Sequence, residues 1–147
     1  GIDDICDLQQ AMAKPDSPLF ADEGPASVLQ GELGAVDERG FCAFGVPQAR
    51  LYVQATDEAC AGPIRLRVLA RDVSIALHNP TGISIQNHLK VIITDLHALS
   101  AGRMLVTTSL QDGQTLLVEI TTWSARQLEL NVGQQVYALI KSVALIR

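Results

Sequence analysis

The sequence predicts a mainly β protein: two small β-barrel modules in tandem, preceded by a short N-terminal helix. Three observations support this prediction. Apolar residues make up 48% of the chain and are mostly aliphatic, since aromatics account for only 4%; β-branched aliphatic runs favour strands. Short alternating segments follow one another between turn residues, at the regular spacing typical of small barrels. Part of this pattern also occurs twice, as expected for two similar modules.

Residues 1–24 predict a helix and a linker. Over residues 2–14, apolar side chains recur at steps of three and four residues and form one stripe, which Pro15 ends. A stripe this small cannot make its own core, so we expect it to dock within this chain or on a domain outside it. The start at Gly1 without Met suggests a fragment of a longer polypeptide.

The first module is predicted over residues 25–79. Its clearest strand is 64–70, where Arg65 and Arg67 alternate with inward-facing aliphatic residues. A turn is expected at 37–40 and a loop at 57–63. The other expected strands cover 27–36, 41–44, 50–53 and 73–77.

The second module is predicted over residues 82–147. Strands are expected at 84–96, 103–110 and 115–121, followed by a short helix opening at Ser124. Ser124 and Gln127 have the S-x-x-Q spacing of a capping box, which predicts a helix N-terminus there. After a turn at 131–133, a strand is expected to continue through Lys141 to the C-terminus.

The internal repeat aligns residues 69–75 with residues 139–145. Each copy follows a glycine-containing turn and an alternating strand. The copies differ in that the first has Arg71-Asp72 where the second has Lys141-Ser142. A carboxylate would repel an anion, so an anion site is expected only in the second copy.

Charge is distributed unevenly along the chain, whose formal net charge is −5. Residues 1–81 contain 6 Lys and Arg against 12 Asp and Glu, whereas residues 82–147 contain 5 against 4. No basic stripe or aromatic platform occurs, which argues against nucleic-acid binding. The 3 cysteines are widely spaced without a C-x-x-C pair, as expected for reduced thiols in the cytosol.

Signatures of catalysis, metal binding and membrane insertion are missing from the sequence. It has no G-x-x-x-x-G-K-[ST] phosphate loop, so the chain as given is not expected to be an enzyme. The 3 histidines lack metal-ligand spacing, and neither a metal nor a cofactor is expected. No apolar run reaches about 18 residues, the length of a membrane span, and neither a membrane span nor a signal peptide is expected.

A group of donor side chains surrounds the predicted helix start in the second module. Thr121 and Ser124 supply hydroxyls, and the following strand brings Lys141 and Ser142. Free N–H groups, hydroxyls and one ammonium, without a carboxylate in the group, suit a small anion. The alternative interpretation is that Ser124 only caps the helix and Lys141 is only a solvated strand residue.

The second module contains four short motifs: Ser84-Ile85-Gln86-Asn87, Thr121-Thr122-Trp123-Ser124, Leu128-x-Leu130-x-x-Gly133 and Ile140-Lys141-Ser142. Together they resemble the molybdate-binding Mop module. The first copy is similar to the related transport-associated oligonucleotide/oligosaccharide-binding (TOBE) module, so both barrels are expected to be OB-like. Behind a helix and a linker, the two copies look like the C-terminal regulatory region of the ATP-binding subunit of a molybdate ABC importer. The likeness covers roughly residues 25–147, and residues 1–24 resemble the tail of its nucleotide-binding domain.

The resemblance implies an oxyanion site for molybdate or tungstate that is assembled from three places and lies between subunits. One departure from the family pattern is Gln86, which stands where the family often has Arg and so removes a charge and a fork of donors. The implied oxyanion-binding residues are Ser84, Gln86, Asn87, Thr121, Ser124, Lys141 and Ser142.

The resemblance further implies a cytoplasmic regulatory domain, peripheral on the inner face of the membrane, that senses the oxyanion and inhibits transport. Its implied partners are a second copy, its own nucleotide-binding domain and, through it, a membrane permease subunit. Two alternatives remain open. One is a structural dimerisation module that no longer binds oxyanion, which Gln86 favours. The other is a free-standing molybdate storage protein, which the acidic helix and linker at residues 1–24 and the diverged first copy disfavour.

Overall fold

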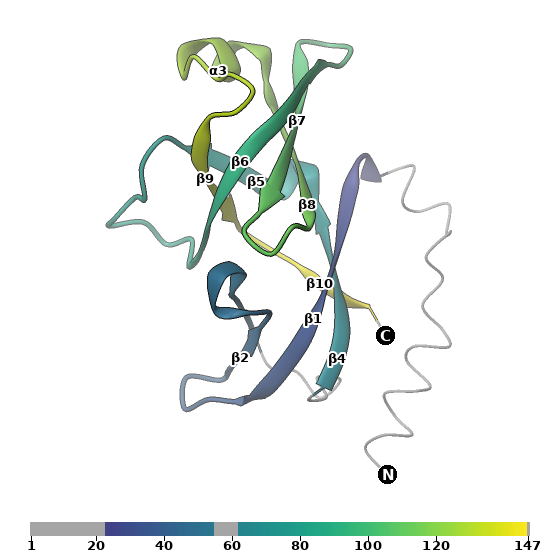
Figure 1. Ribbon diagram of the computed structural model, residues 1–147, viewed down its shortest axis with the longest axis vertical. Coiled ribbons are helices and arrows are strands. Elements are labelled where there is room, and N and C mark those ends of the chain that lie inside the picture. Colours follow the sequence, from purple (N-terminus) through teal and green to yellow (C-terminus); the bar gives the residue numbers. More distant parts are fainter. Residues whose placement is uncertain (1–22, 55–61, 147) are drawn as a thin grey trace.

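The computed structural model describes residues 23–54 and 62–146. Within this part, the protein is mainly β, as predicted: two curled, five-stranded antiparallel sheets with one short α-helix (Figure 1). The predicted helix over residues 2–14 and nearly all of the predicted linker lie outside the described residues. No helix in the described ranges is long and apolar enough to cross a membrane.

The first sheet has the strand order β10-β4-β1-β2-β3, and a 3-10 helix, η1, connects β2 to β3. Most of this sheet lies in the lower half of Figure 1, although one end of β1 reaches higher. Its edges are β3 and β10, and β10 comes from the other end of the chain. The elements are β1 (Ala26–Val36), β2 (Phe41–Phe44), η1 (Pro47–Ala49), β3 (Leu51–Gln54), β4 (Gly62–Leu69) and β10 (Ala144–Ile146).

The second sheet has the order β5-β9-β6-β7-β8, and its two edge strands, β5 and β8, contact each other across the curl. The helix α3 (Thr122–Gln127) follows β8 at the far end of this sheet, at the top of Figure 1. The strands are β5 (Val73–Ala76), β6 (Asn87–Ala98), β7 (Arg103–Leu110), β8 (Thr115–Thr121) and β9 (Gln135–Ile140).

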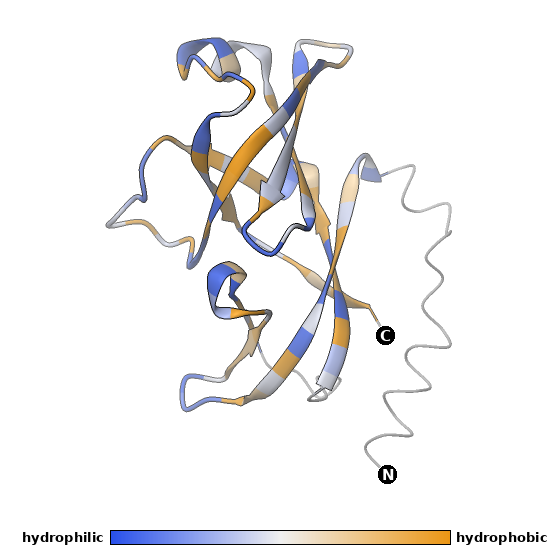
Figure 2. Ribbon diagram, viewed as in Figure 1, coloured by the Kyte–Doolittle hydropathy of each residue, from blue (hydrophilic) through white to orange (hydrophobic). Residues whose placement is uncertain are grey.

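Period-two alternation explains why these segments form strands with one buried face. In β4, Ile64, Leu66 and Val68 are buried, whereas Arg65 and Arg67 are half-buried on the other face, as the sequence predicts. Figure 2 shows the same alternation of apolar and polar residues along β1 and β4. The buried side chains of both sheets form one continuous aliphatic core, in which Phe44 is the largest fully buried side chain.

The turn predicted at residues 37–40 is confirmed, and Asp37 organises it. The Asp37 carboxylate accepts the backbone N–H groups of Phe41 and Arg39 and pairs with the Arg39 side chain at 2.7 Å. The hydrogen bond from the Phe41 N–H lowers the pKa of Asp37 most, and the hydrogen bond from the Arg39 side chain lowers it further. Cys42, on the strand that follows, is buried and free, and burial raises the pKa of its thiol.

The chain crosses between the two sheets twice, at the two segments that the repeat aligns. β4 belongs to the first sheet, but the chain then passes through the 3-10 turn η2 (Ala70–Asp72) into β5 of the second. In the opposite direction, β9 of the second sheet leads through residues 141–143 into β10 of the first. The two sheets therefore exchange one strand each across the predicted module boundary at residues 79–82, and the boundary itself stays a prediction.

The two crossing segments run antiparallel beside each other. Their pairing is regular in both sheets, where Arg67 opposes Ala144 and Val73 opposes Ile140. Between these pairs, one segment has the extra residues that form η2, so the ladder is interrupted and residues 141–143 are not in a strand. The expectation of one strand running through Lys141 to the C-terminus is therefore wrong, because the chain changes sheets there.

Two other predicted boundaries also differ. The strand expected at residues 84–96 begins only at Asn87, and residues 84–86 form an irregular connection. The helix expected to open at Ser124 begins at Thr122, and its N-cap is Thr121. The Thr121 hydroxyl accepts the Ser124 N–H, so the cap is T-x-x-S and Ser124 lies inside the first turn.

Candidate functional site

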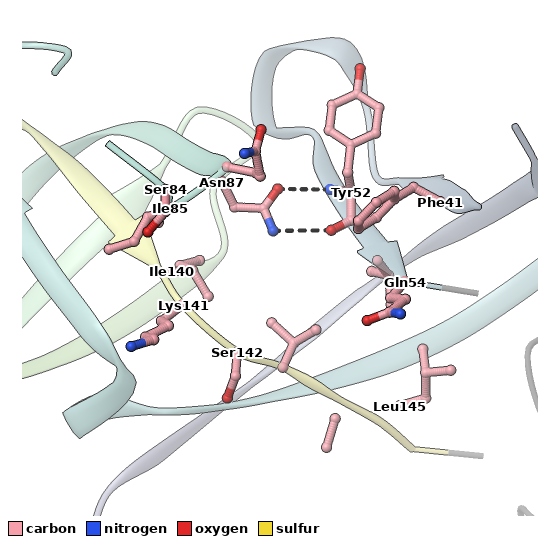
Figure 3. A pocket seen from close by; sticks show the side chains of 14 residues that line it. Phe41, Tyr52, Gln54, Ser84, Ile85, Asn87, Ile140, Lys141, Ser142 and Leu145 are labelled. Carbon is pink, nitrogen blue, oxygen red and sulfur yellow. Dashed lines mark hydrogen bonds between the residues drawn. The ribbon is translucent and has the colours of Figure 1, made fainter. Parts of the chain in front are cut away.

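A cavity of about 650 Å³ lies where the two sheets meet, next to the second crossing segment (Figure 3). Both edge strands of the first sheet line it, β3 through Tyr52 and Gln54, and β10 through Leu145. The irregular connection before β6 and residues 141–143 complete the wall. A cavity of this volume lies in the usual range for small-molecule sites.

Five of the seven residues expected from sequence line this one cavity. They come from two segments more than 50 positions apart, which are brought together because β6 pairs with β9 and Asn87 opposes Ile140. Ser84, Gln86, Lys141 and Ser142 are exposed to solvent, and Asn87 is half-buried. The five are Ser84, Gln86, Asn87, Lys141 and Ser142.

Lys141 is the charged member of the described cavity lining, which contains no carboxylate. None of the ion pairs between described residues involves Lys141. Lys141 lies where the strand ladder is interrupted. Its backbone N–H donates to the Asp72 carbonyl at 3.1 Å, whereas its side chain is exposed to solvent. The cavity therefore combines an ammonium with hydroxyl and amide groups.

Asp72 is the carboxylate in contact with this group, although it does not line the cavity. The Ser142 hydroxyl donates to Asp72 Oδ2 at 3.3 Å. An anion that takes the Ser142 hydroxyl as a donor therefore competes with Asp72, and the two negative charges repel each other. Asp72 belongs to the first repeat copy, so the acidic residue that distinguishes the two copies lies beside the site in the second.

Thr121 and Ser124 are not brought to this cavity. Thr121 opposes Arg103, beside the end of β6 at Ala98, whereas Asn87 starts β6 at the cavity. A strand of this length spans on the order of 30 Å. Within one chain, the residues expected from sequence thus form two separate groups at opposite ends of the second sheet.

The Thr121 and Ser124 hydroxyls form a compact pair at the start of α3. The Thr121 hydroxyl donates to Ser124 Oγ at 2.9 Å and accepts the Ser124 N–H at 2.9 Å. Strand alternation places Glu119 on the same face of β8 as Thr121. Its carboxylate pairs with Arg103 at 2.8 Å, so the charge of Glu119 is compensated. Trp123, which lies between the two hydroxyl residues, is 73% exposed.

Four cavity residues from the first module carry no local signal in the sequence. They reach the cavity only because β3 is the edge of a sheet that faces the start of β6, and they are Phe41 on β2 and Tyr52, Val53 and Gln54 on β3. Their positions in alternating strands predict strand structure but not which strand of another sheet they approach. No pattern in the chain identifies them.

Comparison with known proteins identifies the relatives of this chain. The protein-family model that describes the TOBE domain matches residues 83–146 of this chain. The molybdenum import ATP-binding protein ModC of Aromatoleum aromaticum is 37% identical over 144 residues, which cover 95% of this chain and 37% of the relative. ModC of Vibrio parahaemolyticus is 43% identical over 102 residues, or 67% of this chain and 28% of the relative. ModC 2 of Azotobacter vinelandii is 38% identical and covers 92% of this chain and 38% of the relative.

A solved structure shares the fold. The cytoplasmic molybdate-binding protein ModG, crystallised with molybdate bound, superimposes with a TM-score of 0.69 at 23% identity, covering 82% of this chain and 95% of that one. This likeness agrees with the mainly β fold that the sequence predicts. Residues 83–146 thus match the TOBE domain model, and over nearly its whole length the chain is similar to molybdenum import ATP-binding proteins, of which it spans only a part.

Proposed function

We propose that this chain is the oxyanion-binding regulatory region of the ATP-binding subunit of a molybdate or tungstate importer. The observation that carries the proposal is the convergence of Ser84, Lys141 and Ser142 on one cavity whose described lining is free of carboxylates. A tetrahedral dianion needs several donors and few acceptors, and this lining offers an ammonium, hydroxyls and side-chain amides. The relatives named for molybdenum import support the choice of ligand.

The site is completed by a second copy of the chain in this proposal. Thr121 and Ser124 lie at the end of the second sheet remote from Lys141, so they reach a bound oxyanion only if they come from another molecule. In a two-fold symmetric dimer, each copy would contribute its cavity to one site and its α3 start to the other. Two oxyanions would then bind per dimer.

Regulation follows if the oxyanion binds one arrangement of the two copies better than another. A ligand shifts an equilibrium only by its difference in affinity for the two states, and an anion held between copies favours the arrangement that brings the two groups together. We propose that this arrangement is the one in which the attached nucleotide-binding domains do not drive transport through the permease. In this proposal, the region lies on the cytoplasmic side of the membrane together with the attached nucleotide-binding domains.

Isothermal titration calorimetry of the chain with molybdate tests the proposal. We expect saturable binding of molybdate or tungstate, with sulfate much weaker, and a ratio of two oxyanions per dimer. Heat no different from buffer dilution would favour the alternative, a dimerisation module that has lost its ligand. Gln86 is the observation that favours this alternative, because it replaces the cation that the family pattern often places at that position.

Mixing two variants tests whether the site is shared between copies. Lys141→Ala removes the ammonium from the cavity, whereas Ser124→Ala removes a hydroxyl from α3 but keeps the backbone N–H that Thr121 caps. We expect each variant alone to bind molybdate weakly, and a refolded equimolar mixture to regain normal affinity at one site in each mixed dimer. A mixture that binds no better than either variant would contradict a shared site.

A further inference from the structure

Asn87 is a predicted ligand whose side-chain oxygen and nitrogen both already form hydrogen bonds. Its Oδ1 accepts the Tyr52 N–H at 2.9 Å, and its Nδ2 donates to the Tyr52 carbonyl at 3.0 Å (Figure 3). One carboxamide thus pairs with both main-chain groups of a single residue, as a neighbouring strand would. The orientation of the amide follows from this pairing, since Tyr52 offers one donor and one acceptor.

The two partners belong to different sheets. Asn87 is the first residue of β6 in the second sheet, and Tyr52 lies on β3, the edge strand of the first. Both main-chain groups of Tyr52 form hydrogen bonds with Asn87, which shows that they point away from β2. The family match begins only at residue 83, so this contact reaches from the TOBE domain to a part of the chain outside it.

The first two residues of β6, Asn87 and His88, both hold the connection that carries Ser84 and Gln86. Asn87 attaches its end to β3, and the adjacent His88 ring lies 2.6 Å from the Ile85 carbonyl through Nε2. Ser84 and Gln86 themselves are exposed. Their positions in the cavity wall therefore depend on hydrogen bonds made by the two residues that follow them.

We propose that Asn87 is a positioning residue and not an oxyanion ligand: it ties the anion-binding connection at residues 84–86 to β3 of the first module. This inference rests on the proposed function for its effect on affinity. The first module then forms part of the site, and oxyanion affinity depends on it. By linkage, an oxyanion bound at residues 84–86 stabilises the contact between the two sheets by the same factor.

A matched control exists on the other side of the molecule. Gln114, in the turn before β8, makes the same two-bond pair with the main chain of Gln30 on β1, at 2.7 and 2.9 Å. This pair also joins the two sheets, yet neither residue lines the cavity. A variant of Gln114 thus removes a comparable link between sheets without touching residues 84–86.

The first experiment compares Asn87→Ala with Gln114→Ala in the full chain. We expect both to lower the denaturant midpoint of unfolding. Only Asn87→Ala should weaken molybdate binding in calorimetry, by about tenfold, the equivalent of two net hydrogen bonds. Gln114→Ala should keep the wild-type affinity. Equal losses of affinity in both variants would mean that Asn87 contributes only to general stability, which contradicts the inference. Unchanged affinity in Asn87→Ala would also contradict it.

Variants of Tyr52 distinguish a positioning residue from a ligand. Tyr52→Pro removes the N–H that Asn87 accepts, and proline is tolerated on an edge strand where that N–H faces away from the sheet. Tyr52→Ala removes the same aromatic ring but keeps the N–H. We expect Tyr52→Pro to weaken molybdate binding well beyond Tyr52→Ala. If Asn87 were itself a ligand, the two Tyr52 variants would bind alike.

Hydrogen exchange gives a readout that needs no ligand. In the absence of oxyanion, the amides of residues 84–88 should exchange faster in Asn87→Ala and Tyr52→Pro than in the wild type, and unchanged in Gln114→Ala. Unaltered exchange in all three variants would overturn the tie between the sheets. If the wild type binds no molybdate, the proposed function fails, while this measurement still decides whether Asn87 holds the connection.

Discussion

Replacing Lys141 by alanine is expected to weaken molybdate binding by roughly 1.5–3 kcal/mol, or about 10- to 150-fold. Lys141 is the charged residue of the described cavity lining, and it makes no ion pair within the described residues. A charge-assisted hydrogen bond from its ammonium to a dianion would thus be lost without breaking an ion pair between described residues. Calorimetric titration of the variant measures the effect directly.

Two controls make this result specific. Lys90→Ala removes another exposed ammonium, from a residue of β6 that does not line the cavity, and should leave the affinity unchanged. Lys141→Arg keeps the charge and should retain most of the binding. Because the ammonium is exposed, its contribution should also shrink as salt is added. Wild-type affinity in Lys141→Ala would show that Lys141 has no part in binding the oxyanion.

Ending the chain at Val143 is expected to destabilise the protein by about 3–5 kcal/mol, because it removes β10 from the first sheet. Ile146 is buried and Leu145 is partly buried against the core, opposite Leu66 on β4. The truncated chain would expose that side of β4 while keeping both Lys141 and Ser142. Urea unfolding monitored by circular dichroism gives the change in free energy.

The double variant Leu145→Ala, Ile146→Ala separates side-chain burial from strand pairing. It should lose less stability than the truncation, since the backbone hydrogen bonds to β4 remain. Ile92→Ala, at a position that is 40% exposed on β6, should change the free energy of unfolding by no more than about 0.5 kcal/mol. A truncated chain as stable as the wild type would mean that the first sheet does not depend on the exchanged strand.

Local patterns predicted most strands well because alternation is a property of neighbouring residues. Residues 103–110 and 115–121 were expected as strands and are found with those bounds as β7 and β8. The errors fall where the chain leaves a sheet. Apolar residues lie on both sides of Lys141-Ser142, and the local pattern does not say that β10, after this polar pair, joins the other sheet.

The motif likeness gave the residues expected at the site but not their arrangement within one chain, and their role in binding stays a prediction. The motif likeness selected Ser84, Lys141 and Ser142, which do converge on one cavity. It also selected Asn87, whose carboxamide is engaged with Tyr52, and Thr121, which lies at the other end of the sheet. A motif names residues that recur together in a family; it does not say which of them share a pocket within one chain.

The sequence alone determined the fold class, the strands and the location of the donor-rich motifs, because these depend on periodicity and residue chemistry over short stretches. Only the tertiary structure decided how the strands are shared. It placed β5 of the first predicted module in the second sheet and β10 of the second module in the first. It also separated Thr121 from Lys141 and joined Asn87 to the edge of the first sheet. The physical reason is that an edge strand pairs with whatever backbone or amide the whole fold brings to it, and that choice is made by contacts remote in sequence.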